Sequence, residues 1–416
     1  MLQSLRLRNF RSYVDTDEVA LSRLNVFIGP NNAGKSALLS AVELFLRSLR
    51  GLRVPGPLAF DEMPSFSSFA SVVRRHWTPR QARPVDFALS YTWGVEGRRP
   101  FLFDFTCKGR PTDNVTYVED ASYRWGEGRS LRLRATDATS SPPEYAIEED
   151  GRATTARHAI FRGPMPMVLG LDTADEDRVF LFNELVELEV VHPYRPVPRS
   201  FYVLDDPGLS GEDRRLLSFL IDVWEANGDS VTIKERILTS LKTLGLVTHL
   251  SIHQIGQRQG PKVVEISVAP RLKRHAVSIA DVGFGLSQVL PLVAYDANLV
   301  SGYLVAYQPE VHLHPFAQSR LADLFAASVQ RGNQVFVETH SPDLILRLQT
   351  LVARGDLSAD AVRVFCLSNE RGESRIVPVT FDRHGAPAIP WPPGFLDTSL
   401  SLARELCARR LENGRG

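Results

Sequence analysis

The sequence predicts an α/β fold in which helices cover a mixed, largely parallel sheet. Two observations lead to this prediction. The first fifty residues follow the pattern strand, strand, glycine-rich turn, helix. From residue 261 onward, short apolar runs alternate with stretches of helical periodicity, which is typical of a parallel sheet covered by helices.

The N-terminal elements follow from the spacing of apolar residues. Leu5, Leu7 and Phe10 alternate with polar residues, as in a short strand. Residues 24–28 form a compact apolar run that ends in a Gly-Pro-Asn-Asn turn, so we expect a buried strand. Apolar residues then recur at helical spacing over residues 36–49, which predicts a helix directly after the turn.

The middle of the chain has a different character. Residues 87–93 and 101–106 alternate like neighbouring strands of an antiparallel sheet. Residues 137–156 are rich in Ser, Thr, Ala and acidic residues, which predicts a loop. Two helices are expected over residues 212–226 and 233–246.

The last third predicts strands alternating with helices. The expected strands are 263–268, 303–307, 334–337 and 362–367, and the expected helices lie near 286–299, 316–329, 343–354 and 398–411. We therefore expect a discontinuous core and an antiparallel and helical insertion, followed by a small C-terminal domain. These parts span residues 1–50 with 251–380, residues 51–250, and residues 381–416, respectively.

Composition limits the class of protein. The 416 residues carry 48 basic and 48 acidic side chains, and this zero net charge argues against binding nucleic acid by bulk charge alone. The three cysteines are far apart, which fits a reducing cytoplasm rather than a disulfide framework. The sequence has no secretory start and no apolar run of about 18 residues. We therefore expect a cytoplasmic protein without a membrane partner.

The turn after the first buried strand matches the phosphate-binding pattern Gly-x-x-x-x-Gly-Lys-Ser, also called Walker A, at every fixed position. Glycines let backbone N–H groups point at phosphates, and the helix that follows adds its positive N-terminal dipole. The lysine would neutralise phosphate charge, and the serine hydroxyl would bind Mg²⁺. The predicted nucleotide-binding residues are Gly29, Pro30, Asn31, Asn32, Ala33, Gly34, Lys35 and Ser36.

Further segments resemble the ABC-type ATPases related to RecF, SMC and the overcoming-lysogenization-defect proteins. Residues 5–12 are similar to the first strand and turn of these ATPase heads, and residues 281–288 are similar to the ABC signature sequence. Residues 308–315 are similar to the end of the Walker B strand with its following loop, and residues 338–342 to the switch-histidine motif. Residues 391–395 are similar to the terminal domain of a bacterial AAA branch. The resemblance implies an ABC-type P-loop ATPase head with an inserted region and a small C-terminal cap. Residues 51–200 match poorly.

The resemblance also implies cofactors, roles and partners. Two copies of the chain would sandwich ATP and Mg²⁺, with Gly285, Ser287 and Gln288 of one copy facing the phosphate loop of the other. His340 would contact the γ-phosphate and sense its loss, and Arg11 would lie near the nucleotide. The partners implied are a second copy in an ATP-dependent homodimer and a separately encoded effector. The role implied is that of a sensor or regulator in bacterial DNA transactions, including DNA repair, or in phage defence.

The Walker B segment departs from the family pattern. Tyr307 stands where these ATPases carry the acid that holds Mg²⁺, and a neutral phenol cannot replace a carboxylate there. Gln308 follows where the water-activating residue is expected, and glutamine can orient a water without taking its proton. The candidate catalytic residues are Gln308, Glu310, Glu338 and His340.

Three functions therefore remain open. In the first, Glu310 or Glu338 compensates for Tyr307 and the chain is a slow ATPase. In the second, the chain is a scaffold that binds ATP without hydrolysing it. The third and weakest is a nuclease-associated repair ATPase.

Nucleic acid also remains open as a partner. Arg74, Arg75, Arg80 and Arg83 form one local basic cluster, and Arg129, Arg132 and Arg134 form another. Such clusters are more often solvated surface than a DNA-binding face.

Overall fold

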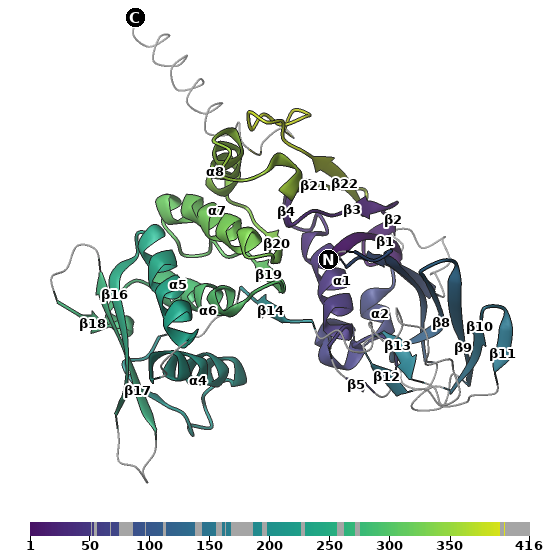
Figure 1. Ribbon diagram of the computed structural model, residues 1–416, viewed down its shortest axis with the longest axis horizontal. Coiled ribbons are helices and arrows are strands. Elements are labelled where there is room, and N and C mark those ends of the chain that lie inside the picture. Colours follow the sequence, from purple (N-terminus) through teal and green to yellow (C-terminus); the bar gives the residue numbers. More distant parts are fainter. Residues whose placement is uncertain are drawn as a thin grey trace, which may run out of the picture.

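The chain is seen here in a computed structural model (Figure 1). The described residues are 1–50, 52–53, 56–66, 68–74, 86–95, 97–110, 114–137, 144–154, 160–162, 164–167, 186–193, 198–225, 229–255, 262–270, 275–391 and 395.

A six-stranded sheet contains four of the strands predicted for the core, those at residues 24–28, 303–307, 334–337 and 362–367. Its strand order is β14-β19-β20-β4-β21-β22, and all neighbours run parallel except β21 and β22. The strands are β14 (Leu188–Val191), β19 (Tyr303–Tyr307), β20 (Gln334–Glu338), β4 (Leu24–Ile28), β21 (Val362–Glu370) and β22 (Glu373–Val379). Every residue of β4, β19 and β20 is buried, as expected for parallel strands that are covered on both faces.

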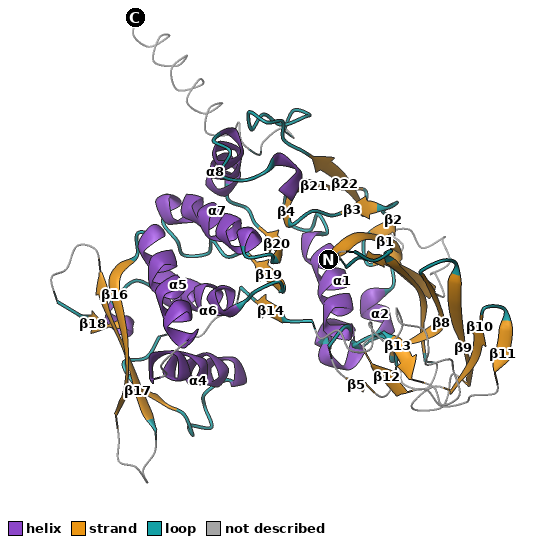
Figure 2. Cartoon of the chain, in the orientation of Figure 1, coloured by secondary structure: helices purple, strands orange, loops and turns teal. Residues whose placement is uncertain are grey.

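Helices cover both faces of this sheet (Figure 2). Alternate strand residues such as Phe27 and Val305 pack in one core cluster with helix α1 (Lys35–Ser48). The residues between them, such as Val26 and Leu304, pack on the other face. The helices on that face are α6 (Phe284–Asn298), α7 (Pro315–Gln330) and α8 (Pro342–Ala353).

A second, antiparallel sheet lies on the far side of α1. Its order is β11-β10-β9-β8-β7-β6-β1-β2, with β3 beside β1. The strands are β1 (Leu2–Phe10), β2 (Tyr13–Asp15), β3 (Val19–Ala20), β6 (Asp86–Trp93), β7 (Phe101–Gly109), β8 (Thr116–Trp125), β9 (Arg129–Asp137), β10 (Glu144–Glu149) and β11 (Arg152–Thr154). Phe45 of α1 stacks on Tyr91 of β6 with ring centroids 4.2 Å apart. Helix α1 is therefore held between the two large sheets.

The remaining elements form two smaller groups. One is a three-stranded sheet of β5 (Leu52–Arg53), β12 (Ile160–Arg162) and β13 (Met165–Met167). The short helix α2 (Phe69–Val72) lies between β5 and β6 in the sequence. The other group packs on α6 and consists of α4 (Gly211–Glu225), α5 (Asp229–Thr243), β15 (Tyr202–Val203), β16 (Val247–Ile255), β17 (Val263–Pro270) and β18 (Val277–Ser278).

The predicted fold class is confirmed, and most predicted elements are present. The loop predicted over residues 137–156 is wrong, because β10 and β11 lie within it. Tyr145 and Ile147 are buried there on either side of the exposed Ala146, so this short period-two pattern predicts a strand more reliably than the polar composition predicts a loop. The helix predicted over 398–411 lies outside the described residues. No helix among the described residues is long and apolar enough to cross a membrane.

Strand pairing crosses the predicted boundaries between core and insertion. β6 lies within the range expected for the insertion, yet it pairs with β1 along most of its length. β14 lies in the same range and pairs with β19 in the parallel sheet. The division into a core, an insertion and a C-terminal domain therefore stays a prediction, since two pairings join its parts.

Gln334, the first residue of β20, connects the two large sheets. The side chain is 1% exposed. Its Oε1 accepts from the Leu2 backbone N–H at 2.8 Å, and its Nε2 donates to the Leu2 and Ser22 carbonyl oxygens at 2.7 and 2.8 Å.

We expect Gln334→Ala to lower the free energy of unfolding by about 2–4 kcal/mol, because it leaves the buried N–H and carbonyl groups of Leu2 unpaired. The Ser22 carbonyl oxygen keeps its other donor, Asn25 Nδ2 at 2.7 Å. Urea denaturation followed by circular dichroism measures this change. Gln330→Ala is the matched control, because Gln330 is exposed on α7 and its side chain donates a hydrogen bond to the Asp356 carbonyl oxygen. Equal losses in the two variants would show that Gln334 does not connect the sheets energetically.

Candidate functional site

The phosphate-loop segment connects β4 to α1, as the sequence predicts. Gly29 has φ +144°, and a Cβ atom there would overlap the Leu367 carbonyl oxygen. Gly34 has φ +98°, and a Cβ atom there would lie 2.6 Å from the Ser374 Oγ. Both positions therefore require glycine, for backbone conformation and for space. The neighbouring hairpin of β21 and β22 packs closely against the loop.

Lys35 lies inside the loop and is 4% exposed. Its Nζ donates to the carbonyl oxygens of Gly29 and Pro30 at 3.0 and 2.8 Å. Burial lowers the pKa of Lys35, while the charges of Glu338 and Glu310 act in the opposite direction. The ammonium group is therefore at the centre of the loop, with two carboxylates close enough to affect its pKa.

Ser36 and Glu338 meet directly. The Ser36 Oγ donates to Glu338 Oε1 at 3.0 Å, although the residues are 302 positions apart. Gln308 Nε2 donates to the same oxygen at 3.4 Å. Glu338 is 2% exposed, and its Oε2 is buried without a hydrogen-bond partner. A hydroxyl and a carboxylate are oxygen ligands of the kind that Mg²⁺ takes, so these residues fit the ion that the sequence predicts.

Glu310 and His340 form a second contact at the same edge of the sheet. The His340 backbone N–H donates to Glu310 Oε1 at 2.6 Å. Glu310 is 7% exposed, and burial raises its pKa. Burial lowers the pKa of His340, and the charge of Lys35 lowers it further, so we expect a neutral imidazole at pH 7. Of the four predicted catalytic residues, Glu338 therefore ends β20, and Gln308, Glu310 and His340 lie on the loops that follow β19 and β20.

Tyr307 points toward α1 rather than toward Ser36. Its hydroxyl donates to Glu43 Oε2 at 2.7 Å, and Glu43 Oε1 accepts from Arg47 Nε at 2.7 Å. Burial and the neighbouring Glu43 raise the pKa of Tyr307, so the phenol is neutral. Sequence reasoning missed Glu43, whose only signal was an acidic residue within the otherwise apolar stretch of residues 41–46.

Tyr13 is another residue that the sequence did not single out. Its hydroxyl donates to the Gly34 carbonyl oxygen at 2.9 Å, directly behind the loop. Burial raises the pKa of Tyr13. The only signal for this contact was the place of Tyr13 directly after residues 5–12, the segment that resembles the family's first strand and turn.

Arg11 has φ +50° and packs on aromatic rings. Its guanidinium lies 5.8 Å from the Phe10 ring centroid and 5.4 Å from that of Phe66. Burial lowers its pKa, and Tyr307 acts against this shift. These contacts place Arg11 against the antiparallel sheet, so its role toward a nucleotide stays a prediction.

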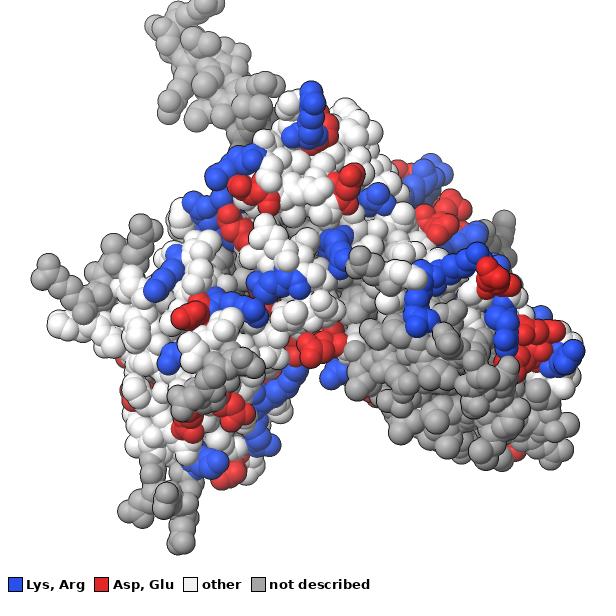
Figure 3. Space-filling view, viewed as in Figure 1, with Lys and Arg blue, Asp and Glu red and all other residues white. Residues whose placement is uncertain are grey.

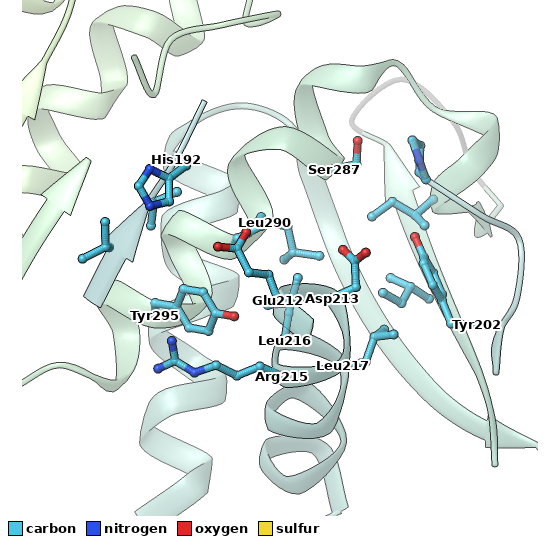
Figure 4. A pocket seen from close by; sticks show the side chains of 16 residues that line it. His192, Tyr202, Glu212, Asp213, Arg215, Leu216, Leu217, Ser287, Leu290 and Tyr295 are labelled. Atoms are coloured by element: carbon cyan, nitrogen blue, oxygen red, sulfur yellow. The ribbon is translucent and has the colours of Figure 1, made fainter. Parts of the chain in front are cut away.

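The predicted signature segment begins α6. A Cβ atom on Gly285 would lie 2.7 Å from the His312 carbonyl oxygen, so only glycine fits where α6 meets the loop after β19. The Ser287 Oγ donates to the Phe284 carbonyl oxygen at 2.8 Å, and Gln288 is buried. Ser287 also lines a pocket between α4 and α6 together with Asp213 (Figure 4).

The basic clusters are largely neutralised where they are described. Arg132 and Arg134 both pair with Asp120, at 2.8 and 3.4 Å, and Arg129 pairs with Asp150 at 2.7 Å. Basic and acidic side chains are interspersed over the face shown in Figure 3. Of the other cluster, Arg74 pairs with Glu373 at 3.1 Å. Arg75, Arg80 and Arg83 lie outside the described residues.

Comparison with known proteins extends these observations. Residues 1–72 and 230–345 match the AAA ATPase domain family. Over 359 residues the chain is 42% identical to the OLD nuclease of Thermus scotoductus, and the match covers 82% of this chain and 59% of that protein. The chain thus spans less than two thirds of the length of this relative.

Two SMC heads are among the solved structures that the chain matches over most of its length. One is the Smc head bound to the C-winged helix domain of ScpA, at 15% identity and a TM-score of 0.49, covering 92% of this chain and 98% of that chain. The other is the SMC head domain from Thermotoga maritima, at 14% identity and a TM-score of 0.42, covering 91% of this chain and 98% of that chain.

The matches in sequence agree with the phosphate loop and with the geometry around it. The resemblance inferred from the motifs is therefore confirmed: the chain carries an AAA ATPase domain over residues 1–72 and 230–345 and is similar in sequence to the OLD nuclease of Thermus scotoductus.

Proposed function

We propose that this chain is an ABC-type ATPase head that binds and slowly hydrolyses ATP with Mg²⁺ and acts as an ATP-gated homodimer. The single observation that carries the proposal is the meeting of Lys35, Ser36 and Glu338 at the first turn of α1. A buried ammonium, a hydroxyl and a carboxylate are the groups that a nucleotide phosphate and its metal ion require.

Phosphate binding would rest on the loop and on α1. The loop residues Gly29–Ser36 place their backbone at the N-terminus of a 14-residue helix, where the N–H groups and the helix dipole attract anions. Lys35 now bonds to carbonyl oxygens of the loop, and phosphate oxygens would replace these acceptors.

Hydrolysis would use the loops after β19 and β20. Gln308 lies beside the Ser36 and Glu338 pair, where its amide can orient a water. Glu310 has a raised pKa, which brings a carboxylate closer to the range of a general base. His340, neutral beside Lys35, can donate to a phosphate oxygen without adding charge. Because position 308 holds no carboxylate, we expect ATP hydrolysis to be slow.

Dimerisation would use the face that carries the signature segment. Phe284 at the start of α6 is 49% exposed, and Phe316 at the start of α7 is 46% exposed. Exposed aromatic side chains around Gly285 and Ser287 suit burial against a second copy of the chain. In that arrangement Ser287 would hydrogen-bond the γ-phosphate held by the other copy.

The cellular role proposed is that of a sensor or regulator of a separately encoded effector, in bacterial DNA transactions or in phage defence. The likeness to a protein named OLD nuclease supports a link to nucleic-acid processing. A nuclease-associated repair ATPase is the variant of this role that the same likeness favours.

A second candidate function is an ATP-binding scaffold without turnover. Tyr307 favours it, because this side chain occupies the Walker B acid position and bonds to Glu43 instead of reaching Ser36. The scaffold would dimerise with ATP and would dissociate without releasing phosphate.

Lys35→Ala is expected to reduce phosphate release from Mg-ATP by about 10- to 150-fold. This range corresponds to the roughly 1.5–3 kcal/mol of a hydrogen bond to a charged group. Steady-state phosphate release measures it, and Lys242→Ala on the exposed face of α5 is the matched control that keeps full activity.

Two results would contradict the proposal that the chain hydrolyses ATP. If the wild type binds ATP but releases no more phosphate than Lys35→Ala, the scaffold is favoured. If the wild type fails to bind ATP, both functions are wrong.

Ser287→Arg is expected to abolish ATP-dependent dimerisation while ATP binding by the monomer is retained, because a large cation would block the interface but not the phosphate loop. Light scattering after size exclusion, with a non-hydrolysable ATP analogue, measures the mass. Thr239→Arg, at an exposed position of α5, should still dimerise. A Ser287→Arg dimer of wild-type affinity would refute this interface.

A further inference from the structure

Three aligned side chains end the central strands on the α1 side. Parallel pairing places Phe27 of β4 opposite Glu338 of β20, and Glu338 opposite Tyr307 of β19. Aligned residues of neighbouring strands point to the same face of a sheet. Phe27 and Tyr307 both belong to the core cluster that packs on α1. Glu338 therefore faces α1 as well, one strand closer to the phosphate loop than Tyr307.

Position 307 cannot supply a ligand near Ser36. Its hydroxyl is bound to Glu43, which lies seven residues beyond Ser36, or about 10 Å along the helix. The phenol keeps its proton, since burial and the carboxylate of Glu43 both raise its pKa.

Glu338 has the position and the free oxygen that a metal ligand needs. Its Oε1 lies 3.0 Å from the Ser36 Oγ. Neighbouring oxygens around Mg²⁺ are about 2.9 Å apart, given octahedral geometry and bonds of about 2.0–2.1 Å. The other oxygen, Oε2, is buried and has no hydrogen-bond partner, which is costly for an ionised carboxylate unless a cation is near.

Glu310 is placed differently, although its Oε2 also lacks a hydrogen-bond partner. Its Oε1 accepts from the His340 backbone N–H and so ties together the loops after β19 and β20. The hydroxyl of Ser36 bonds to Glu338 instead. This division assigns loop positioning to Glu310 and leaves Glu338 as the carboxylate next to the metal-binding serine.

We infer that the metal-holding carboxylate of this ATPase has moved by one strand, about 4.8 Å, from position 307 of β19 to Glu338 of β20. Glu338 and Ser36 would then hold Mg²⁺ together, while Gln308 fixes the carboxylate from the β19 side. The inference rests on the proposed function, because it requires that the loop binds ATP.

The test is the effect of Mg²⁺ on ATP affinity, measured by isothermal titration of the full chain with Mg²⁺ and again with EDTA. We expect the wild type to bind ATP more tightly with Mg²⁺. In Glu338→Gln, the ratio of ATP affinity with Mg²⁺ to ATP affinity in EDTA should be about tenfold or more smaller than in the wild type. This is the loss expected when a charged ligand is removed. In EDTA the same variant should bind ATP at least as tightly as the wild type, because one negative charge near the phosphates is gone.

Matched variants separate a lost ligand from a damaged fold. Glu338→Asp keeps the charge and should keep most of the enhancement. Glu189→Gln replaces a buried glutamate of β14 that pairs with Arg215, and should behave like the wild type. Ser36→Ala combined with Glu338→Gln should lose no more of the enhancement than either change alone, since both residues would hold one ion.

Two outcomes would overturn the inference while leaving ATP binding intact. In the first, Glu338→Gln keeps the full enhancement by Mg²⁺. In the second, Glu310→Gln loses the enhancement and Glu338→Gln does not, which would make Glu310 the ligand. Failure of the wild type to bind ATP in either solution would instead overturn the proposed function, and the inference with it.

Discussion

The packing of α1 between two sheets is the constraint on which the site depends. Nearly every residue of this helix is buried, and it contacts the parallel sheet on one side and the antiparallel sheet on the other. The Tyr91 hydroxyl donates to the Ala41 carbonyl oxygen, and the Tyr13 hydroxyl donates to that of Gly34. These bonds fix both the axis of the helix and its first turn. The N–H groups that would receive phosphate are thus held in place before any ligand arrives, as electrostatic preorganisation requires.

The same packing determines where charge can be placed. A carboxylate at the end of β19 would face α1 near Glu43, and two close buried carboxylates repel each other. The phenol of Tyr307 instead donates to Glu43 and completes a buried chain that ends at Arg47. One strand away, Glu338 faces the first turn of α1, where Lys35 and the helix dipole favour a negative group. In the inferred arrangement, the carboxylate thus lies where its surroundings favour negative charge, and position 307 adds no charge to the core.

Much of this fold can be predicted from the sequence. The apolar runs at residues 24–28 and 303–307 gave the buried strands, and the glycine and lysine pattern gave the loop, because both depend on local spacing. The pairing of β14 with β19 could not be predicted in this way, since it joins segments over a hundred residues apart. The short period-two pattern of β10 was not recognised, because the surrounding residues 137–156 are rich in polar residues. Within the site, the motifs named Glu338 and Glu310 as alternatives, and their different hydrogen bonds, to Ser36 and to the His340 N–H, become visible only in the structure.

The position of β4 in its sheet has a consequence for the order of synthesis. Its two neighbours, β20 and β21, follow it in the chain by about 300 residues or more. At about 5–20 residues per second, a ribosome needs roughly 15 to 60 s to make β20 after β4. During that time β6 can pair with β1, and β7, β8 and β9 can add to β6 in turn, whereas the loop that would hold phosphate has no sheet behind it. The nascent chain can thus complete its antiparallel sheet before the strands that flank β4 exist, and the proposed nucleotide site can form only after β20 has been made.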